Sequence, residues 1–137
     1  ETMRIHRNES NERFPRFSFT QKEFVLDKTC FMITGDDLLF ILGVINSHVI
    51  NYYIKKNIAV LDVGGFLMQK IYIEQFPIPK ANKKEKEELE NLVQEILFMK
   101  ENGLDTEGLE NKIDNLVFSL YQLDELEIQF IKDGNTP

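Results

Sequence analysis

The first part of the chain, to about residue 34, alternates apolar and polar positions in the way that half-buried strands do. Five of its apolar positions are phenylalanines: Phe14, Phe17, Phe19, Phe24 and Phe31. The segments 30–34 and 58–66 also have the short apolar pattern of strands, and the pair Gly64-Gly65 in the second indicates a tight turn. These segments predict a small sheet of short strands.

Between these segments the apolar spacing becomes that of a helix. From position 38 to position 56 apolar residues recur on nearly every face, which predicts a buried helix. Asp36-Asp37 are expected to cap its start. Asn46-Ser47 are expected to break the helix into two pieces, with the serine capping the second.

The last third of the chain has helical periodicity throughout. Two prolines within residues 76–80 end the preceding structure. A first helix is expected to begin at Asn82 and to end at Asn102-Gly103, and a second runs to about residue 121. A third, short helix is expected near Asp124 with three buried residues: Leu126, Phe130 and Ile131.

These elements predict a mixed α+β fold for the 137 residues. It would consist of a short-stranded sheet packed with a buried helix, followed by a C-terminal helical hairpin. We place a boundary at residue 80, so that residues 1–80 form an α/β core and residues 81–137 form the helical hairpin.

Charge is distributed unevenly between these two parts. The net charge is −7, but residues 1–80 hold 10 Lys or Arg against 9 Asp or Glu, whereas residues 81–137 hold 6 against 14. The acidity is therefore confined to the helical part and does not argue against DNA contact by the first 80 residues. Four arginines, interleaved with His6, lie near the start and suit base edges and phosphates: Arg4, Arg7, Arg13 and Arg16.

The composition also indicates where in the cell the protein is located. No apolar run reaches the ~18–20 residues of a membrane span, and the polar N-terminus does not resemble a signal peptide. The single cysteine, Cys30, cannot form an internal disulfide and suits a reducing cytoplasm. We expect a cytoplasmic protein without a membrane partner and, because the chain lacks an initiator methionine, a part of a longer protein.

Signals of catalysis are largely missing from the sequence. It contains neither a nucleotide-binding glycine loop nor the Asn/Asp-Pro-Pro tetrapeptide of amino-methyltransferases. His6, His48 and Cys30 are too few and too scattered to predict a zinc site. A Cys–His nucleophile pair stays open, although a thiol in an apolar strand is usually buried and inert.

One pattern in the helical part is typical of metal-dependent nucleases. Glu110, Asn111 and Lys112 form an E-x-K triplet, and Asp105 lies upstream. The triplet falls on the polar face of an amphipathic helix, which favours a solvated helix surface instead. The glutamates of residues 85–95 are likewise interpreted as an outer face that confers solubility.

The stretch from Phe40 to Lys80 resembles a known family. It contains ILGVINSHVINYYIKK (41–56) and GGFLMQKIYIEQFPIPK (64–80), and the tail IDNLVFSLYQLDELEIQFI (113–131) follows. In this order these segments are similar to the TaqI-like C-terminal specificity domain of type IIG restriction-modification enzymes and adenine-specific DNA methyltransferases. RFSFTQKEFVLDKTCFMI (16–33) is similar to the strand pair that precedes the "NS" helix of that family.

The resemblance implies recognition of duplex DNA without catalysis in this chain. The parent enzyme would bind S-adenosylmethionine, and Mg²⁺ where it also cleaves, in other domains, and would methylate a flipped adenine. The helices 81–137 would dock on those methyltransferase or nuclease domains, or pair in a dimer. The residues expected to contact DNA are Arg4, His6, Arg7, Arg13, Arg16, Lys55, Lys56, Gly64, Gly65, Gln69 and Lys70.

Two other functions stay open at this point. The chain could be a protein-interaction module that acts through its helical hairpin, with a purely structural α/β part. It could also be a small nuclease that uses Glu110, which Mg²⁺-dependent cleavage would reveal.

Overall fold

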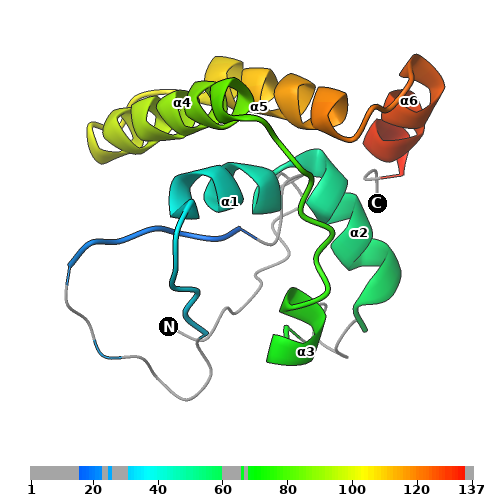
Figure 1. Ribbon diagram of the computed structural model, residues 1–137, viewed down its shortest axis with the longest axis horizontal. Coiled ribbons are helices and arrows are strands. Elements are labelled where there is room, and N and C mark those ends of the chain that lie inside the picture. The colour runs from blue at the N-terminus through cyan, green and yellow to red at the C-terminus, as the bar shows by residue number, and fades with distance from the viewer. Residues whose placement is uncertain (1–15, 23–24, 26–30, 60–65, 67, 135–137) are drawn as a thin grey trace.

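The computed structural model describes residues 16–22, 25, 31–59, 66 and 68–134, and these residues form six helices (Figure 1). The helices are α1 (Leu38–Ile45), α2 (His48–Asn57), α3 (Lys70–Ile73), α4 (Lys83–Glu101), α5 (Glu107–Leu120) and α6 (Glu125–Asp133). Within the described residues no strand and no sheet is present. The predicted α+β fold is therefore wrong, and the described architecture is helical.

The difference lies in the segments that were predicted as strands. Residues 16–20 and 31–34 contain no helix, but they join no ladder of backbone hydrogen bonds with a second strand. Phe31 and Met32 are exposed, so the apolar alternation there does not reflect one buried face. Residues 70–73, for which the sequence predicted no element, form helix α3. Alternation identifies a segment suited to a sheet, but a strand also needs a neighbouring strand.

Helices α1 and α2 meet at a sharp joint. They are bent by 64° at Asn46-Ser47, which confirms the predicted break. The Ser47 hydroxyl donates to the carbonyl of Val44 at 2.7 Å and accepts from the amide of Ile50, which confirms its role as a cap. The predicted cap at the start of α1 is wrong, because Asp37 makes no capping hydrogen bond and instead forms an ion pair with Lys86 of α4.

The core lies where α1 and α2 pack against α4 and α5 (Figure 1). Its most buried residues are Val44, Ile50, Ile54, Leu89 and Val117. A Cβ atom added to Gly43 would lie 2.2 Å from Leu89 Cδ2, so the glycine permits the close approach of α1 to α4. Residues on both sides of position 80 therefore share one core.

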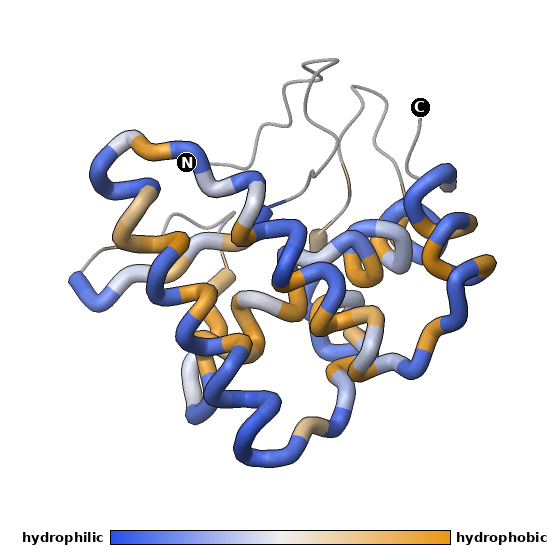
Figure 2. The backbone as a smooth tube through the Cα atoms, turned by 90° about the horizontal axis from the view of Figure 1, so that it is seen from above, coloured by the Kyte–Doolittle hydropathy of each residue, from blue (hydrophilic) through white to orange (hydrophobic). Residues whose placement is uncertain are grey.

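The outer helices carry the local signals expected from the sequence. Capping boxes are present at Asn82 with Glu85 and at Asp124 with Glu127, and Gly103 takes the left-handed φ of 68° after α4. Hydrophilic and hydrophobic residues alternate along these helices (Figure 2).

Helix α6 departs from the expected burial. Ile131 is buried, but Leu126 is 81% exposed and Phe130 is 62% exposed. The prediction that all three are buried is therefore wrong for two of them. Among the described helices, α6 packs mainly against α2, and much of the Leu126 and Phe130 side chains stays outside that contact.

In the described part of the chain, no single helix has the length and apolar content of a membrane span. The bent pair α1–α2 meets these criteria only when its two helices are counted together.

Candidate nucleic-acid interface

Some of the residues expected to contact DNA lie outside the described residues: Arg4, His6, Arg7, Arg13, Gly64 and Gly65. So does Cys30, the candidate nucleophile. The structure places the others at two separate locations. Arg16 lies against α5, whereas the rest belong to the last turn of α2 or to the start of α3.

The second location is a basic end of the molecule. Lys55 and Lys56 form the last turn of α2, and Gln69 and Lys70 begin α3. The C-terminal end of α2 and the whole of α3 lie on the side of the molecule opposite α4 and α5 (Figure 1). We call these four residues the basic end.

At the basic end, Lys56, Gln69 and Lys70 are exposed, and Lys55 is half-buried. The ammonium group of Lys56 lies over the Tyr52 ring, 5.6 Å from its centroid. The ammonium group of Lys70 pairs with Glu74 at 3.4 Å, and both side chains are exposed. Such an exposed pair is weak, so its lysine can exchange a carboxylate for a phosphate at little cost.

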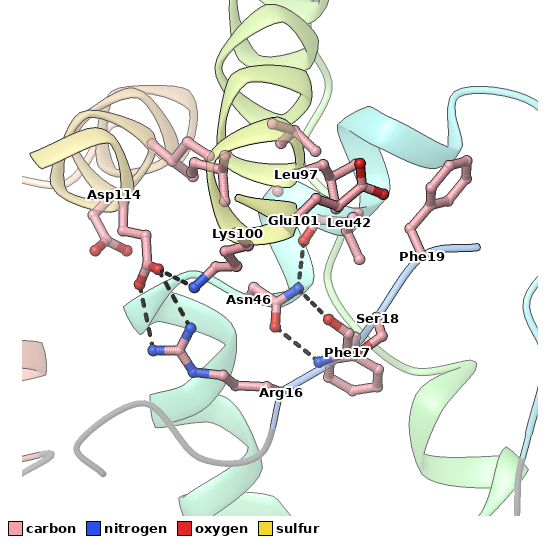
Figure 3. Close-up of a pocket in the computed structure, with 15 residues that line it drawn as sticks. Arg16, Phe17, Ser18, Phe19, Leu42, Asn46, Leu97, Lys100, Glu101 and Asp114 are labelled. Atoms are coloured by element: carbon pink, nitrogen blue, oxygen red, sulfur yellow. Dashed lines mark hydrogen bonds and ion pairs between the residues drawn. The ribbon is translucent and has the colours of Figure 1, made fainter. Parts of the chain in front are cut away.

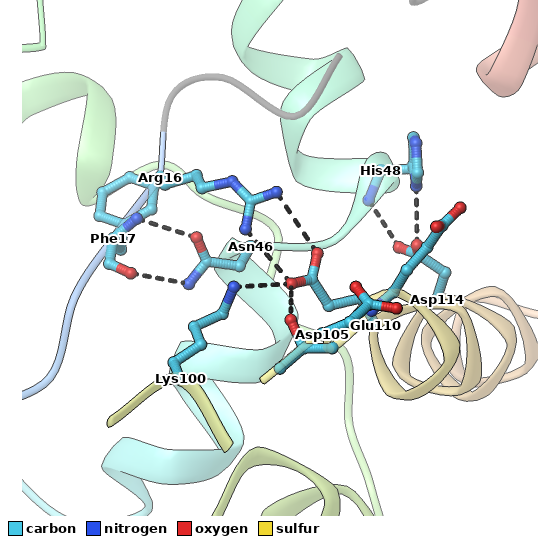
Figure 4. A network of polar contacts seen from close by, with 10 residues as sticks. Arg16, Phe17, Asn46, His48, Lys100, Asp105, Glu110 and Asp114 are labelled. Carbon is cyan, nitrogen blue, oxygen red and sulfur yellow. Dashed lines mark hydrogen bonds and ion pairs between the residues drawn. The ribbon is translucent and has the colours of Figure 1, made fainter. Parts of the chain in front are cut away.

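The other location is built around Glu110 of α5. The Arg16 guanidinium donates to its two carboxylate oxygens at 3.5 and 3.3 Å. Lys100 of α4 lies 2.9 Å from the carboxylate, and the Thr106 hydroxyl donates to it at 2.7 Å (Figure 4). Only 14% of the Glu110 side chain is exposed, so the predicted solvated helix face is wrong at this residue.

The charge state of Glu110 depends on these neighbours. Burial of the carboxyl group raises its pKa, but the hydrogen bonds from Thr106 and Lys100 and the charge of Arg16 together lower it to about 2. The group is therefore an anion at neutral pH. Within the described residues, no three His, Cys, Asp or Glu side chains are placed to hold a metal ion. Glu110 consequently acts as an acceptor for two cations.

Asn46 holds the chain next to Arg16. Its side-chain oxygen accepts from the amide of Phe17 at 2.8 Å, and its side-chain nitrogen donates to the carbonyl of Phe17 at 3.1 Å (Figure 3). The same nitrogen donates to the carbonyl of Leu42 at 3.0 Å. The Phe17 and Phe76 rings make a T-shaped contact, with centroids 6.0 Å apart. The sequence predicted Asn46 only as a helix breaker.

Another long-range contact fixes the start of α2. The carboxylate of Asp114 in α5 accepts from the backbone amide of His48 at 2.9 Å and contacts its Nδ1 atom at 2.7 Å. Asp114 is 3% exposed. The joint between α1 and α2 is thus held from α5 as well as by its own serine cap.

A cavity of about 430 Å³ lies beside this network. Its walls come from residues 16–19, α1, α4 and α5, and Lys100 and Glu101 lie at its polar side (Figure 3). Leu42, Val93 and Leu97 supply apolar walls.

A comparison with known proteins shows a relationship that the geometry alone does not reveal. Over 109 residues the chain is 30% identical to the type II methyltransferase M.MjaIV of Methanocaldococcus jannaschii. The chain is related to a restriction-modification methyltransferase. The match takes in 77% of the chain but 36% of that protein, so the chain spans about a third of the length of this relative. No family profile matches the chain, and no solved structure does.

This relation confirms the restriction-modification part of the resemblance found in the sequence. The stretch that the chain shares with this methyltransferase is much longer than any single motif, which indicates a common origin of the two sequences.

Proposed function

We propose that this chain is the DNA-recognition part of a restriction-modification methyltransferase, similar to the TaqI-like specificity domain. It would bind duplex DNA at the target site and leave catalysis to another part of the protein. One observation carries the proposal: the chain is related to a type II methyltransferase, yet its sequence lacks the Asn/Asp-Pro-Pro tetrapeptide and a glycine-rich cofactor loop. S-adenosylmethionine, and Mg²⁺ in a parent that cleaves, would then bind outside this chain.

The distribution of charge supports this proposal. The exposed acids of α4, which include Glu87, Glu88 and Glu95, would repel phosphates from the outer helices. The end of α2 and helix α3, which carry the basic end, lie away from α4 (Figure 1). A duplex would therefore approach the basic end, and phosphate contacts there would orient it.

The role of Arg16 is revised within this proposal. Its guanidinium is engaged by Glu110, so we assign it to holding the chain in place. Arg13 and the arginines before it keep the proposed role of contacting bases or phosphates.

A salt-dependent titration with fluorescent duplex DNA tests the proposal. We expect binding at low salt that weakens steeply as salt rises, because each neutralised phosphate releases counterions and contributes about −0.9 to the slope of log K against log salt. A pool of random duplexes serves as the probe, since non-specific binding uses the same phosphate contacts. If no duplex binds at about 50 mM salt, the DNA-recognition role is wrong.

A contact with the rest of a longer parent protein is a second proposed role, supported by α6. Leu126 is 81% exposed, and Phe130 is 62% exposed and makes a T-shaped contact with Tyr52 at a centroid distance of 5.9 Å. Single exposed apolar residues are common, but two on one short helix suit a docking surface. Because the chain spans 36% of its relative, we assign this surface to the remaining part of such a protein.

Binding of the separately expressed remainder of the parent tests this second role. Serine at both positions, Leu126→Ser with Phe130→Ser, should weaken that binding at least tenfold, since two apolar side chains would no longer be buried at the interface. Sedimentation of the chain alone then tests whether the surface binds a second copy of the chain instead. A dimer that the same substitutions dissociate would assign the surface to a second copy instead.

A further inference from the structure

We propose that Tyr52 is a positioning residue of the basic end, and that its ring holds the ammonium group of Lys56 in place for contact with a DNA phosphate. The inference rests on the proposed function, because it concerns how a cation of the basic end is presented to the duplex. Tyr52 would act through the lysine and would not itself contact DNA.

The first observation is the contact between the two side chains within α2. Lys56 follows Tyr52 by four residues, so the two side chains lie about one helical turn apart on the same face. The ammonium group lies 5.6 Å from the centroid of the Tyr52 ring. A ring face attracts a cation within about 6 Å of its centroid. The ring therefore restricts the positions that the charge of this exposed lysine can take.

The second observation is that α6 holds the Tyr52 ring. The ring makes a T-shaped contact with Phe130, with centroids 5.9 Å apart. A Cβ atom added to Gly134 would lie 3.1 Å from Cε2 of Tyr52, so the backbone at the end of α6 passes close to the same ring. Helix α6 buries Ile131, which fixes the helix itself. The ring that Lys56 contacts is consequently limited in its movement by a second helix.

A lysine that is already ordered binds a phosphate at a lower cost in entropy. The long lysine side chain has many rotamers, and it loses much of this freedom when its ammonium group pairs with a phosphate. A ring that restricts the side chain beforehand removes part of that loss. The ammonium group has three donors, and the ring faces only one side of it, so donors remain for the phosphate. Loss of the ring should therefore weaken DNA binding although every cation of the basic end is kept.

The experiment uses variants of the full chain and the random duplex pool as the probe. Tyr52→Leu removes the ring but keeps an apolar side chain, whereas Tyr52→Phe keeps the ring. Lys56→Gln removes the cation, and its combination with Tyr52→Leu completes a double-mutant cycle. Lys86→Gln is the matched control. The Lys86 ammonium group also lies over a ring, 5.7 Å from the Phe40 centroid, but it belongs to α4 on the opposite side of the molecule (Figure 1).

We expect Tyr52→Leu to bind duplex DNA about 2- to 5-fold more weakly than the wild type at temperatures well below its Tm. Tyr52→Phe and Lys86→Gln should retain the wild-type affinity. In the Lys56→Gln background, Tyr52→Leu should have no further effect, because the lysine that the ring positions is gone. A merely structural role would weaken binding by the same factor in both backgrounds, and that result would overturn the inference. An equal loss in Tyr52→Phe would also overturn it, because the ring would then not be what matters.

NMR of the free protein separates this inference from the proposed function. An aromatic ring shifts the resonances of protons that lie over its face, so the Hε signals of Lys56 should change in Tyr52→Leu and stay in place in Tyr52→Phe, whether or not DNA binds. Unchanged signals in Tyr52→Leu would overturn the contact itself. If the wild-type chain binds no duplex, the proposed function fails and the role of Tyr52 in DNA binding fails with it. If the wild type binds and Tyr52→Leu matches it, the inference fails alone.

Discussion

At the scale of single residues, Glu110 makes the stability of the protein depend on pH in the acidic range. Its pKa is about 2 in the folded protein, against an ordinary value of 4.5, so folding favours the ionised form. This contribution is complete above about pH 5 and is lost as the pH falls from 4.5 towards 2. Allowing for solvent screening of a half-buried group, we expect about 1–2 kcal/mol over that window.

The measurement is urea unfolding of the wild type and of Glu110→Gln at pH 5, 4 and 3. The variant should be less stable at pH 5, and the difference should shrink as the pH falls, because glutamine does not titrate. All other acids are common to both proteins and cancel. A difference that stays constant with pH would mean that the Glu110 charge does not contribute.

Gly43 offers a second test at this scale, because it lies where α1 approaches α4. A methyl group there would clash with Leu89 and contact Val93 at 3.0 Å, and both neighbours are buried. Gly43→Ala should therefore cost about 1–3 kcal/mol of unfolding free energy despite the better helix propensity of alanine. Gly108 in α5 is the control, since a Cβ there meets nothing within 4 Å. Gly108→Ala should be neutral or stabilising by up to about 1 kcal/mol, and equal effects in urea unfolding would contradict the close approach.

At the scale of elements, the joint between α1 and α2 depends in part on one hydroxyl. Ser47 is 1% exposed, and its hydroxyl accepts from the buried amide of Ile50, so alanine would remove that acceptor. The Val44 carbonyl would still accept from the backbone amide of residue 47. We expect Ser47→Ala to lower the free energy of unfolding by about 1–2 kcal/mol. Ser119→Ala on the exposed side of α5 should stay within about 0.5 kcal/mol. Thermal unfolding compares the two, and similar Tm values would show that the joint does not need this cap.

The elements also show which features the sequence could predict. The ends of α4 and the cap of α2 depend on residues within one helical turn of each other, such as Asn82 with Glu85, and these were predicted correctly. The sheet was not, because a strand depends on a neighbour that local alternation cannot reveal. The long-range contacts of Asn46, His48 and Arg16 were missed for the same reason. Asn46 meets a residue 29 positions away, His48 one 66 away and Arg16 one 94 away.

At the scale of the whole molecule, the separation of charge makes a prediction that net charge alone does not. Lys55 and Lys56 end α2 at the basic end, whereas Lys83 and Lys84 begin α4 in the acidic helical part. Reversing either pair to glutamate changes the net charge by the same amount. Any difference between the two double variants must therefore come from where the charges lie.

We expect the Lys55→Glu, Lys56→Glu protein to bind duplex DNA at least tenfold more weakly than the Lys83→Glu, Lys84→Glu protein. Its salt slope should also be smaller in magnitude by about 2, because each lysine neutralises about one phosphate. Fluorescence anisotropy at several salt concentrations measures both quantities, and circular dichroism checks that the two proteins fold alike. Equal effects of the two double substitutions would mean that DNA responds only to overall charge. A larger effect of the second would place the duplex on the outer helices and would reverse the proposed division between the basic end and the acidic part.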